Sequence, residues 1–460
     1  MHTLVMRIYC MEWFAVRRNR TQNKVDKRIQ QIRAKFVHPV VVRRMSAGTK
    51  DIIPTIVYSE NRHEDIEECI EQAGGTIKYK YPLINAVAAN IPATSIDDIA
   101  AHHMIQFINH DAKVFKCMDN ATLAIVAHRI NDLGYTGKGV GIAVLDTGVY
   151  PHYDLTRPTN RIVAFKDMVN ARNSPYDDDG HGTHVSGIAA GNGYSQSKYK
   201  GIAPEANIIG VKVLDGNGSG STSDILAGIQ WVIDNKDRYN IRILNMSLGA
   251  PAEKSYREDP LAKAAARASQ QGILVCTAAG NSGPNAGTIN SPGISPDVLT
   301  VGAVDDNKTH TYEDDFVASF SSRGPTPSGL TKPDIVAPGV DIYSLSNKGP
   351  TSYVAHSGTS MATPMVAGSA ALLMEKEPNL SAAQVRSRML NTTVNIREGR
   401  NAEGHGIINV KAMLDIDDQD LSNIEDSPPR NRSPRRLPKF KLPSTENFDP
   451  SLLALLMLLL

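Results

Sequence analysis

Cysteine is scarce in this chain of 460 residues, and its spacing fits no cysteine-based framework. The four cysteines are Cys10, Cys69, Cys117 and Cys276. No two of them stand at Cys-x-x-Cys spacing, and none lies near a histidine at the spacing of a metal site. We therefore expect neither a disulfide framework nor a zinc site. Sparse, unpaired cysteines are typical of a reducing compartment.

The sequence also lacks an excess of one charge and a long apolar run. Basic residues number 49 and acidic residues 48, so the net charge of +1 indicates no nucleic-acid partner. No stretch approaches the roughly 20 apolar residues of a membrane-spanning helix. Arg7 and Glu12 interrupt the early apolar residues, which is not the pattern of a secretory signal. We expect no membrane span and a cytoplasmic protein, with unconventional export left open.

The length and an apolar content of 41% predict two or three folded domains. Residues 1–48 are basic, which is typical of a solvated extension, with binding to an anionic partner or a membrane surface as the alternative. Residues 413–460 pass from an acidic patch into a Pro/Arg-rich stretch and predict a disordered tail. Two folded units, 49–116 and 120–412, lie between these ends.

Residues 49–116 predict a small α+β unit. Strands are expected over 52–58, 76–81, 84–91 and 104–108, with helices over 62–71 and 95–102. The order β-α-β-β-α-β is that of a ferredoxin-like module.

Residues 120–412 alternate short apolar runs with helical patterns. Strands are expected over 141–145, 208–214, 241–246, 273–278 and 298–304. Helices are expected over 183–190, 223–235, 260–271, 361–375 and 381–390. This alternation predicts an α/β fold with a parallel sheet.

Three short segments carry side chains suited to joint catalysis, and Asp146 stands in the first of them. It ends a buried strand in Ala-Val-Leu-Asp-Thr-Gly, at the sheet edge where ligands of open α/β folds gather. Asp-Thr-Gly also occurs in aspartic proteases, but these need a second such motif, which the sequence lacks. A structural aspartate at the end of a strand is the remaining alternative.

His181 begins the second segment, His-Gly-Thr-His-Val-Ser-Gly. Its imidazole titrates near neutral pH, so it can accept and return a proton. A metal pair with His184 is the alternative, although no acid follows at the spacing of zinc peptidases.

Ser360 stands in the third segment, Gly-Thr-Ser-Met-Ala-Thr-Pro, where a glycine turn runs into an apolar helix. In isolation this serine would be read as a helix N-cap. A serine hydroxyl becomes a nucleophile when a base takes its proton, and the base needs a buried carboxylate to fix its tautomer. Asp146, His181 and Ser360 supply these groups in the order Asp, His, Ser, which is one of the known triad orders.

Asn281 follows another buried strand, in Ala-Ala-Gly-Asn-Ser-Gly. Its amide can donate to an oxyanion, with the backbone N–H of Ser360 as the second donor. The alternative is a turn asparagine, because Asn-Ser-Gly is a common turn sequence.

Together these segments resemble the subtilisin-like serine peptidases, the subtilases. The resemblance covers about residues 120–410. It implies a doubly wound, mostly parallel sheet and the hydrolysis of protein or peptide substrates through an acyl-enzyme on Ser360. The same resemblance implies that the substrate cleft is lined by Ser219, Gly220, Ser247, Leu248 and Gly249. Because Ser282 after Asn281 is not an acid, we expect an apolar or aromatic preference in the main pocket.

Residues 49–116 resemble the propeptide of many subtilases, above all over 84–92. The resemblance implies an intramolecular chaperone and inhibitor that the enzyme itself removes, with the cut between about Asp111 and Asn120. The stretches 168–170 and 176–181 resemble the AprX-type subtilases, which are bacterial enzymes made without a secretion signal.

Many secreted subtilases carry a calcium loop after the helix of the catalytic histidine. Here the corresponding stretch, 191–200, holds two lysines and no acid, and Asp154 alone fits a ligand position. We expect no metal ligand set and no required cofactor, with a weak structural calcium left open. A peptide-binding pseudoprotease without turnover is the alternative function, although all four chemical groups of an active enzyme are present.

Overall fold

The computed structural model describes residues 24–25, 29–30, 52–60, 62–111, 113–116, 121–122, 127–309 and 312–417. Most of the expected N-terminal extension and C-terminal tail lies outside these ranges. Within them, Val25 and Ile29 are buried in the core of the small unit, so these two positions are not solvated. Leu414 and Ile416 are likewise buried in the core of the large unit, so chain packing continues past residue 412.

The small unit has the expected β-α-β-β-α-β order. Its elements are β1 (Ile52–Ser59), α3 (Glu67–Gln72), β2 (Thr76–Tyr81), β3 (Ala86–Pro92), α4 (Ile96–Ala101) and β4 (Ile105–His110). The sheet order β2-β3-β1-β4 is antiparallel throughout, which confirms the ferredoxin-like prediction. Because side chains alternate along a strand, β1 buries Val57 against the helices of the small unit and Ile56 and Tyr58 against the large unit.

The large unit is built on an eight-stranded sheet in the order β16-β15-β13-β11-β7-β9-β8, with β17 also paired to β15. The strands are β7 (Gly141–Asp146), β8 (Ile162–Asp167), β9 (Asn207–Lys212), β11 (Ile241–Met246), β13 (Leu274–Ala278), β15 (Leu299–Asp305), β16 (Phe316–Val317) and β17 (Ile335–Pro338). All neighbours are parallel except β15 and β16. Strands β8, β16 and β17 were not among the expected ones.

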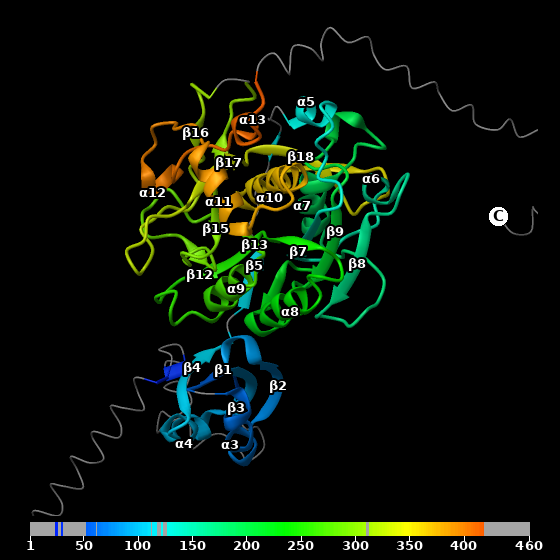
Figure 1. The fold of residues 1–460 in the computed structure, drawn as a ribbon. Helices are drawn as coiled ribbons and strands as arrows, with labels where there is room; N and C mark the ends of the chain where they lie inside the picture. Colours follow the sequence, from blue (N-terminus) through cyan, green and yellow to red (C-terminus); the bar gives the residue numbers. More distant parts are fainter. Residues whose placement is uncertain are drawn as a thin grey trace, which may run out of the picture.

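Helices cover both faces of this sheet, which confirms the doubly wound prediction (Figure 1). One face packs against α8 (Thr222–Asp234) and α9 (Pro260–Gln270). The other packs against α7 (His181–Ala190), α10 (Thr359–Lys376) and α11 (Ala382–Asn391). Figure 1 shows the small unit, in blue, on the side of α8 and α9. Among the described residues, no helix is both long and apolar enough to cross a membrane.

Two smaller sheets complete the large unit. One has the order β10-β5-β12-β14, from β10 (Ser219–Ser221), β5 (Lys113–Lys116), β12 (Leu248–Pro251) and β14 (Asn290–Ser291). The other has the order β19-β18-β6, from β19 (Tyr353–His356), β18 (Asp341–Leu345) and β6 (Ala121–Thr122). In the first sheet, a strand that directly follows the small unit pairs with two strands of the large unit.

Candidate active site

Asp146 and His181 meet at the carboxyl edge of the large sheet. Asp146 is the last residue of β7, and His181 is the first residue of α7. The Nδ1 atom of His181 lies 2.7 Å from Oδ1 of Asp146, and both residues are buried. Since an ionised carboxylate can only accept, Nδ1 carries the proton and Nε2 is left as the basic nitrogen. The backbone N–H of Thr147 donates to the same Oδ1 at 2.7 Å and holds the carboxylate in place.

Ser360 is the second residue of α10 and is fully buried. Its Oγ donates to the carbonyl of Ser247 at 2.9 Å, while the Ser247 hydroxyl donates to the carbonyl of Ser360 at 2.9 Å. Ser247 directly follows β11, which runs parallel to β7 and pairs with it. Parallel strands end at the same edge of a sheet, so Ser360 is tied to the edge that carries Asp146. Helix α10 also packs against α7, which begins with His181.

Asn281 lies just past β13, the next strand of the parallel sheet. Its Oδ1 accepts from the backbone N–H of Thr359 at 3.0 Å and from the Thr359 hydroxyl at 2.8 Å. These two donors fix which end of the amide is the oxygen. The Nδ2 group, beside the residue that precedes Ser360, has no hydrogen-bond partner among the described residues. It is therefore an unused hydrogen-bond donor close to Ser360.

Asp177 joins the end of β7 to the start of α7, a role that the sequence analysis did not assign. Its Oδ1 accepts from the Thr147 hydroxyl at 2.9 Å and from the N–H of Gly180 at 2.8 Å. Its Oδ2 accepts from the N–H of Thr183 at 2.9 Å and from the Thr183 hydroxyl at 2.7 Å. An acid four residues before His181 was visible in the sequence, but its partners only become neighbours through the fold.

Gly182 allows the segments that carry Asp146 and His181 to approach each other. A Cβ atom at this position would lie 2.2 Å from the carbonyl oxygen of Gly148 and 3.0 Å from the Cβ of Asp146. Because 2.2 Å is far shorter than any contact between non-bonded heavy atoms, every side chain larger than hydrogen would push His181 away from Asp146.

His184, one turn after His181, is a core residue. Its Nε2 lies 3.0 Å from the carbonyl of Ile342 and 3.1 Å from that of Val354, so this nitrogen carries a proton. A protonated nitrogen has no lone pair to offer a metal ion. Burial lowers its pKa well below the ordinary value. Among the described residues, no three His, Cys, Asp or Glu side chains are grouped to hold a metal ion.

The residues expected to line the substrate cleft lie on both sides of β5, a strand of the same chain. Strand β5 pairs antiparallel with β10, with Phe115 opposite Ser219 and Val114 opposite Gly220. On its other side β5 pairs antiparallel with β12, with Lys116 opposite Leu248 and Phe115 opposite Gly249. Ser247, the remaining expected cleft residue, directly precedes β12. The residues that the sequence predicted to bind a substrate strand thus lie in or next to β10 and β12, the two strands that pair with β5.

The residues at the loop that carries calcium in many secreted subtilases do not fit a calcium ion. The Asp154 carboxylate accepts from the N–H of Ser195 at 2.9 Å and from the hydroxyl of Tyr353 at 2.8 Å. The buried Arg161 guanidinium donates to the carbonyls of Asp154, Ala190 and Ala206. Burial lowers the pKa of Arg161 to about 10, which leaves it charged at neutral pH. Protein donors thus already occupy the oxygens that a cation would use.

Comparison with known proteins agrees with this geometry. The model of the Subtilase family matches residues 137–412. Serine protease AprX of Bacillus subtilis is 45% identical over 358 residues, which covers 73% of this chain and 80% of that protein. Subtilisin E of the same organism is 35% identical over 353 residues, or 75% of this chain and 85% of the relative. An alkaline protease of Alkalihalobacillus alcalophilus is 36% identical over 338 residues, covering 73% and 80%. The chain therefore belongs to the subtilase family of serine proteases.

Proposed function

We propose that this protein hydrolyses peptide bonds through an acyl-enzyme on Ser360, with His181 as general base and Asp146 as the group that orients it. The observation that carries the proposal is the buried 2.7 Å contact between His181 Nδ1 and Asp146 Oδ1. It directs the basic Nε2 of the imidazole away from Asp146, as required for taking the proton of a serine. Ser360 is held at the same sheet edge by its two hydrogen bonds to Ser247.

The reaction follows from these groups. The Ser360 hydroxyl leaves the Ser247 carbonyl, gives its proton to His181 Nε2 and attacks the substrate carbonyl. The Asp146 carboxylate stabilises the imidazolium that forms. The oxyanion is stabilised by Asn281 Nδ2 and by the N–H of Ser360, which lies in the first turn of α10 and has no intrahelical acceptor. His181 then protonates the leaving amine, and water releases the acyl group by the reverse sequence.

Substrates bind as an added strand between β10 and β12. Main-chain hydrogen bonds give such binding its affinity, and they are indifferent to sequence. The support for this mode is β5, which pairs with both strands over Lys113–Lys116. We therefore propose that unfolded or extended protein segments are the substrates.

The small unit acts as the propeptide, and its docked position supports that role. The Asp111 carboxylate accepts from the N–H of Ser223 at 2.8 Å and from its hydroxyl at 2.6 Å, at the N-terminus of α8. The Tyr81 hydroxyl donates to the carbonyl of Ser223 at 2.8 Å. The apolar face of the small sheet packs against α8 and α9, so the unit that feeds β5 into the cleft is itself anchored to the enzyme.

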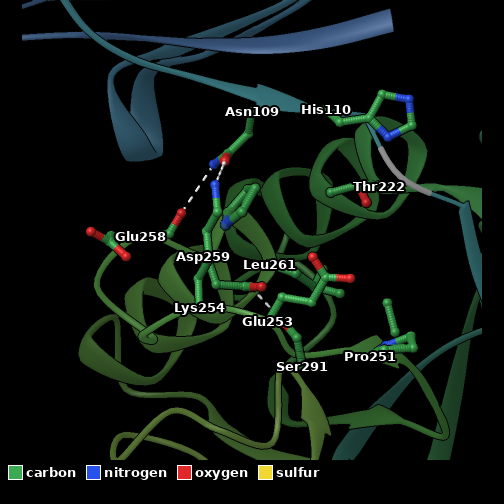
Figure 2. Close-up of a pocket in the computed structure, with 12 residues that line it drawn as sticks. Asn109, His110, Thr222, Pro251, Glu253, Lys254, Glu258, Asp259, Leu261 and Ser291 are labelled. Atoms are coloured by element: carbon green, nitrogen blue, oxygen red, sulfur yellow. Dashed lines mark hydrogen bonds between the residues drawn. The ribbon is translucent and has the colours of Figure 1, made fainter. Parts of the chain in front are cut away.

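A second polar contact between the two units lies two residues before Asp111. Figure 2 shows Asn109 facing Lys254 and Glu258 across a pocket between the two units. The Asn109 amide donates to the carbonyl of Glu258 at 3.0 Å and accepts from the Lys254 ammonium at 3.1 Å. Together with Asp111, this contact fixes the chain on both sides of His110, just before β5.

The register of β5 indicates which peptide bond is cut in self-processing. The last described pair of β5 sets Lys116 opposite Leu248, and Ser247 directly precedes Leu248. The Ser360 hydroxyl lies 2.9 Å from the Ser247 carbonyl, so the proposed nucleophile stands close to where the described part of β5 ends. We propose that self-processing cuts between Cys117 and Met118, inside the interval expected from the sequence.

The test compares the full chain with its Ser360→Ala variant by intact mass, N-terminal sequencing and casein hydrolysis. We expect the wild type to release a fragment ending at Cys117 and to digest casein, while the variant stays whole and inactive. Cleavage elsewhere would overturn the register but leave the triad intact. Processing and activity in the variant would overturn the nucleophile. A wild type that binds casein without cutting it would favour the pseudoprotease.

A further inference from the structure

A pair of buried carboxylates lies far along the chain from the catalytic residues, where β15 turns into β16. The antiparallel register sets Val304 opposite Val317 and Asp305 opposite Phe316. One more step along the hairpin brings Asp306 level with Asp315. Directly opposed residues of an antiparallel pair have Cβ atoms about 4.5–5.5 Å apart, and like charges in such a pair are destabilising.

Strand alternation turns both carboxylates inward. Val304 and Val317 are buried in a small apolar cluster with Val336 and Ile407. Asp306 and Asp315 follow at a spacing of two residues and share that inner face, while Phe316 points out to solvent. Asp306 is only 3% exposed and Asp315 only 8% exposed. The hairpin therefore buries two acids side by side.

Each of these two carboxylates has one oxygen without a hydrogen-bond donor among the described residues. Oδ2 of Asp306 and Oδ1 of Asp315 are closed from solvent and have no hydrogen-bond partner among the described residues. The Asp306 carboxylate accepts a bond at 3.2 Å from the N–H of Lys308. The Lys308 ammonium itself points elsewhere, because it pairs with Asp341 at 2.9 Å.

Two other acids of the large unit, the partly buried Asp334 and the buried Asp177, have the partners that this pair lacks. Asp334 pairs with the buried Lys332 at 2.5 Å and with Arg386 at 3.1 Å. Asp177 accepts four bonds of 2.9 Å or less. Unpaired buried charges are costly enough that a group changes its protonation or acquires a counter-ion. Burial raises the pKa of Asp306 to about 7 and that of Asp315 to about 6, as expected for an arrangement that lacks a positive charge.

We propose that Asp306 and Asp315 bind a calcium ion that ties β15 to β16. The donors are carboxylate oxygens, which hard cations prefer over nitrogen or sulfur ligands. Calcium completes its shell with water and main-chain oxygens, and it tolerates irregular geometry better than magnesium does. The ion cross-links the loop that leads into the edge of the large sheet, so its role is stability rather than catalysis.

The test uses the full chain in a Ser360→Ala background, which prevents self-digestion. After treatment with EGTA, calcium chloride at about 100 times its Kd is expected to raise the Tm by about 5 °C or more. The Asp306→Asn/Asp315→Asn variant should lose this shift and should melt higher than the parent in EGTA, because the like-charge contact is gone. The Asp305→Asn/Asp314→Asn variant removes the same charge from the same loop and should keep the shift.

Terbium gives a second measurement that does not depend on the folding of the double variant. Tyr312 packs against the apolar cluster of Val304 and Val317, two residues along each strand from the pair. We expect tyrosine-sensitised terbium emission that calcium displaces and that Tyr312→Phe strongly reduces. The proposal is overturned if calcium leaves the Tm unchanged, if the shift survives in Asp306→Asn/Asp315→Asn, if it is lost in Asp154→Asn instead, or if magnesium alone produces it.

Discussion

The Nδ1 atom of His181 lies 2.7 Å from Oδ1 of Asp146, in a site closed to water on both sides of the contact. One residue ends a central strand and the other begins a buried helix, so their distance is set by the packing of β7 against α7. The Asp177 carboxylate reinforces that packing, because it accepts hydrogen bonds from Thr147 just after β7 and from Thr183 in α7. The geometry of this contact is therefore set by the core of the large unit.

Replacing Asp146 with Asn tests the role of this contact. The amide keeps the shape of the side chain but favours the wrong imidazole tautomer, so we expect kcat to fall about 10⁴-fold. Substrate binding should change little, because the β10 and β12 strands are untouched. Steady-state kinetics with a chromogenic peptide measure kcat and KM. Circular dichroism is the control for folding. A kcat within tenfold of wild type would remove Asp146 from the mechanism.

Asn281→Ala tests the oxyanion donor. Since Nδ2 acts on the transition state, we expect a loss of about 10²–10³-fold in kcat with a nearly unchanged KM. Asn391→Ala, on the surface at the end of α11, is the matched control and should match the wild type. An equal effect of Asn281→Ala on KM and kcat would instead indicate a contact already made with bound substrate.

Asp177→Ala tests the support of the triad. Removing this carboxylate leaves the buried N–H groups of Gly180 and Thr183 without their acceptor, at a cost of about 3 kcal/mol or more. In a Ser360→Ala background, calorimetry should show a Tm lower by about 6–12 °C. If Asp177→Ala lowers the activity of the protein that keeps Ser360 but leaves the Tm unchanged in the Ser360→Ala background, Asp177 acts on the chemistry directly.

Tyr81→Phe tests the propeptide interface. The variant loses the donor to the Ser223 carbonyl, and we expect the processed propeptide to dissociate about 2- to 10-fold faster. The readout is the lag before casein hydrolysis after processing. Tyr194→Phe changes an exposed tyrosine and should leave the lag unaltered. A longer lag in Tyr81→Phe would contradict the proposed docking.

The same interface makes the dissociation of the propeptide depend on pH. Burial raises the pKa of Asp111 in the docked state, so docking favours the protonated carboxyl. This contribution is complete below the ordinary pKa of about 4 and is lost as the pH rises through the docked value. We expect the propeptide of the wild type to dissociate faster as the pH rises from 4 to 7, and Asp111→Asn to flatten that profile. A profile that is identical in both proteins would exclude Asp111 as its source.

The sequence predicted the parts of the fold that have strong local patterns. Buried parallel strands such as 141–146 form continuous apolar runs, and the candidate catalytic motifs stand at or just after their ends. Both the strands and the motifs could therefore be predicted from the sequence. Strand β8 was missed because it carries an exposed Val163 and a lysine and lies at the sheet edge. Strand β17 was missed because it has four residues and ends in Pro338.

Other features depend on contacts between distant residues. Lys113–Lys116 carries no strand signal of its own, and it is extended because strands more than 100 residues later pair with it. Asp177 stands in a visible acidic stretch, but its partner Thr147 lies 30 residues earlier. The pairing of Asp306 with Asp315 likewise appears only through the register of the hairpin.

Labelling by phenylmethylsulfonyl fluoride tests the central claim most directly. This reagent sulfonylates a serine only when a neighbouring base activates it. We predict one sulfonyl group per processed chain, located on Ser360 by peptide mapping, and none in a His181→Ala variant processed in trans by the wild type. Labelling of another serine, or equal labelling of Ser360 without His181, would contradict the assignment of nucleophile and base.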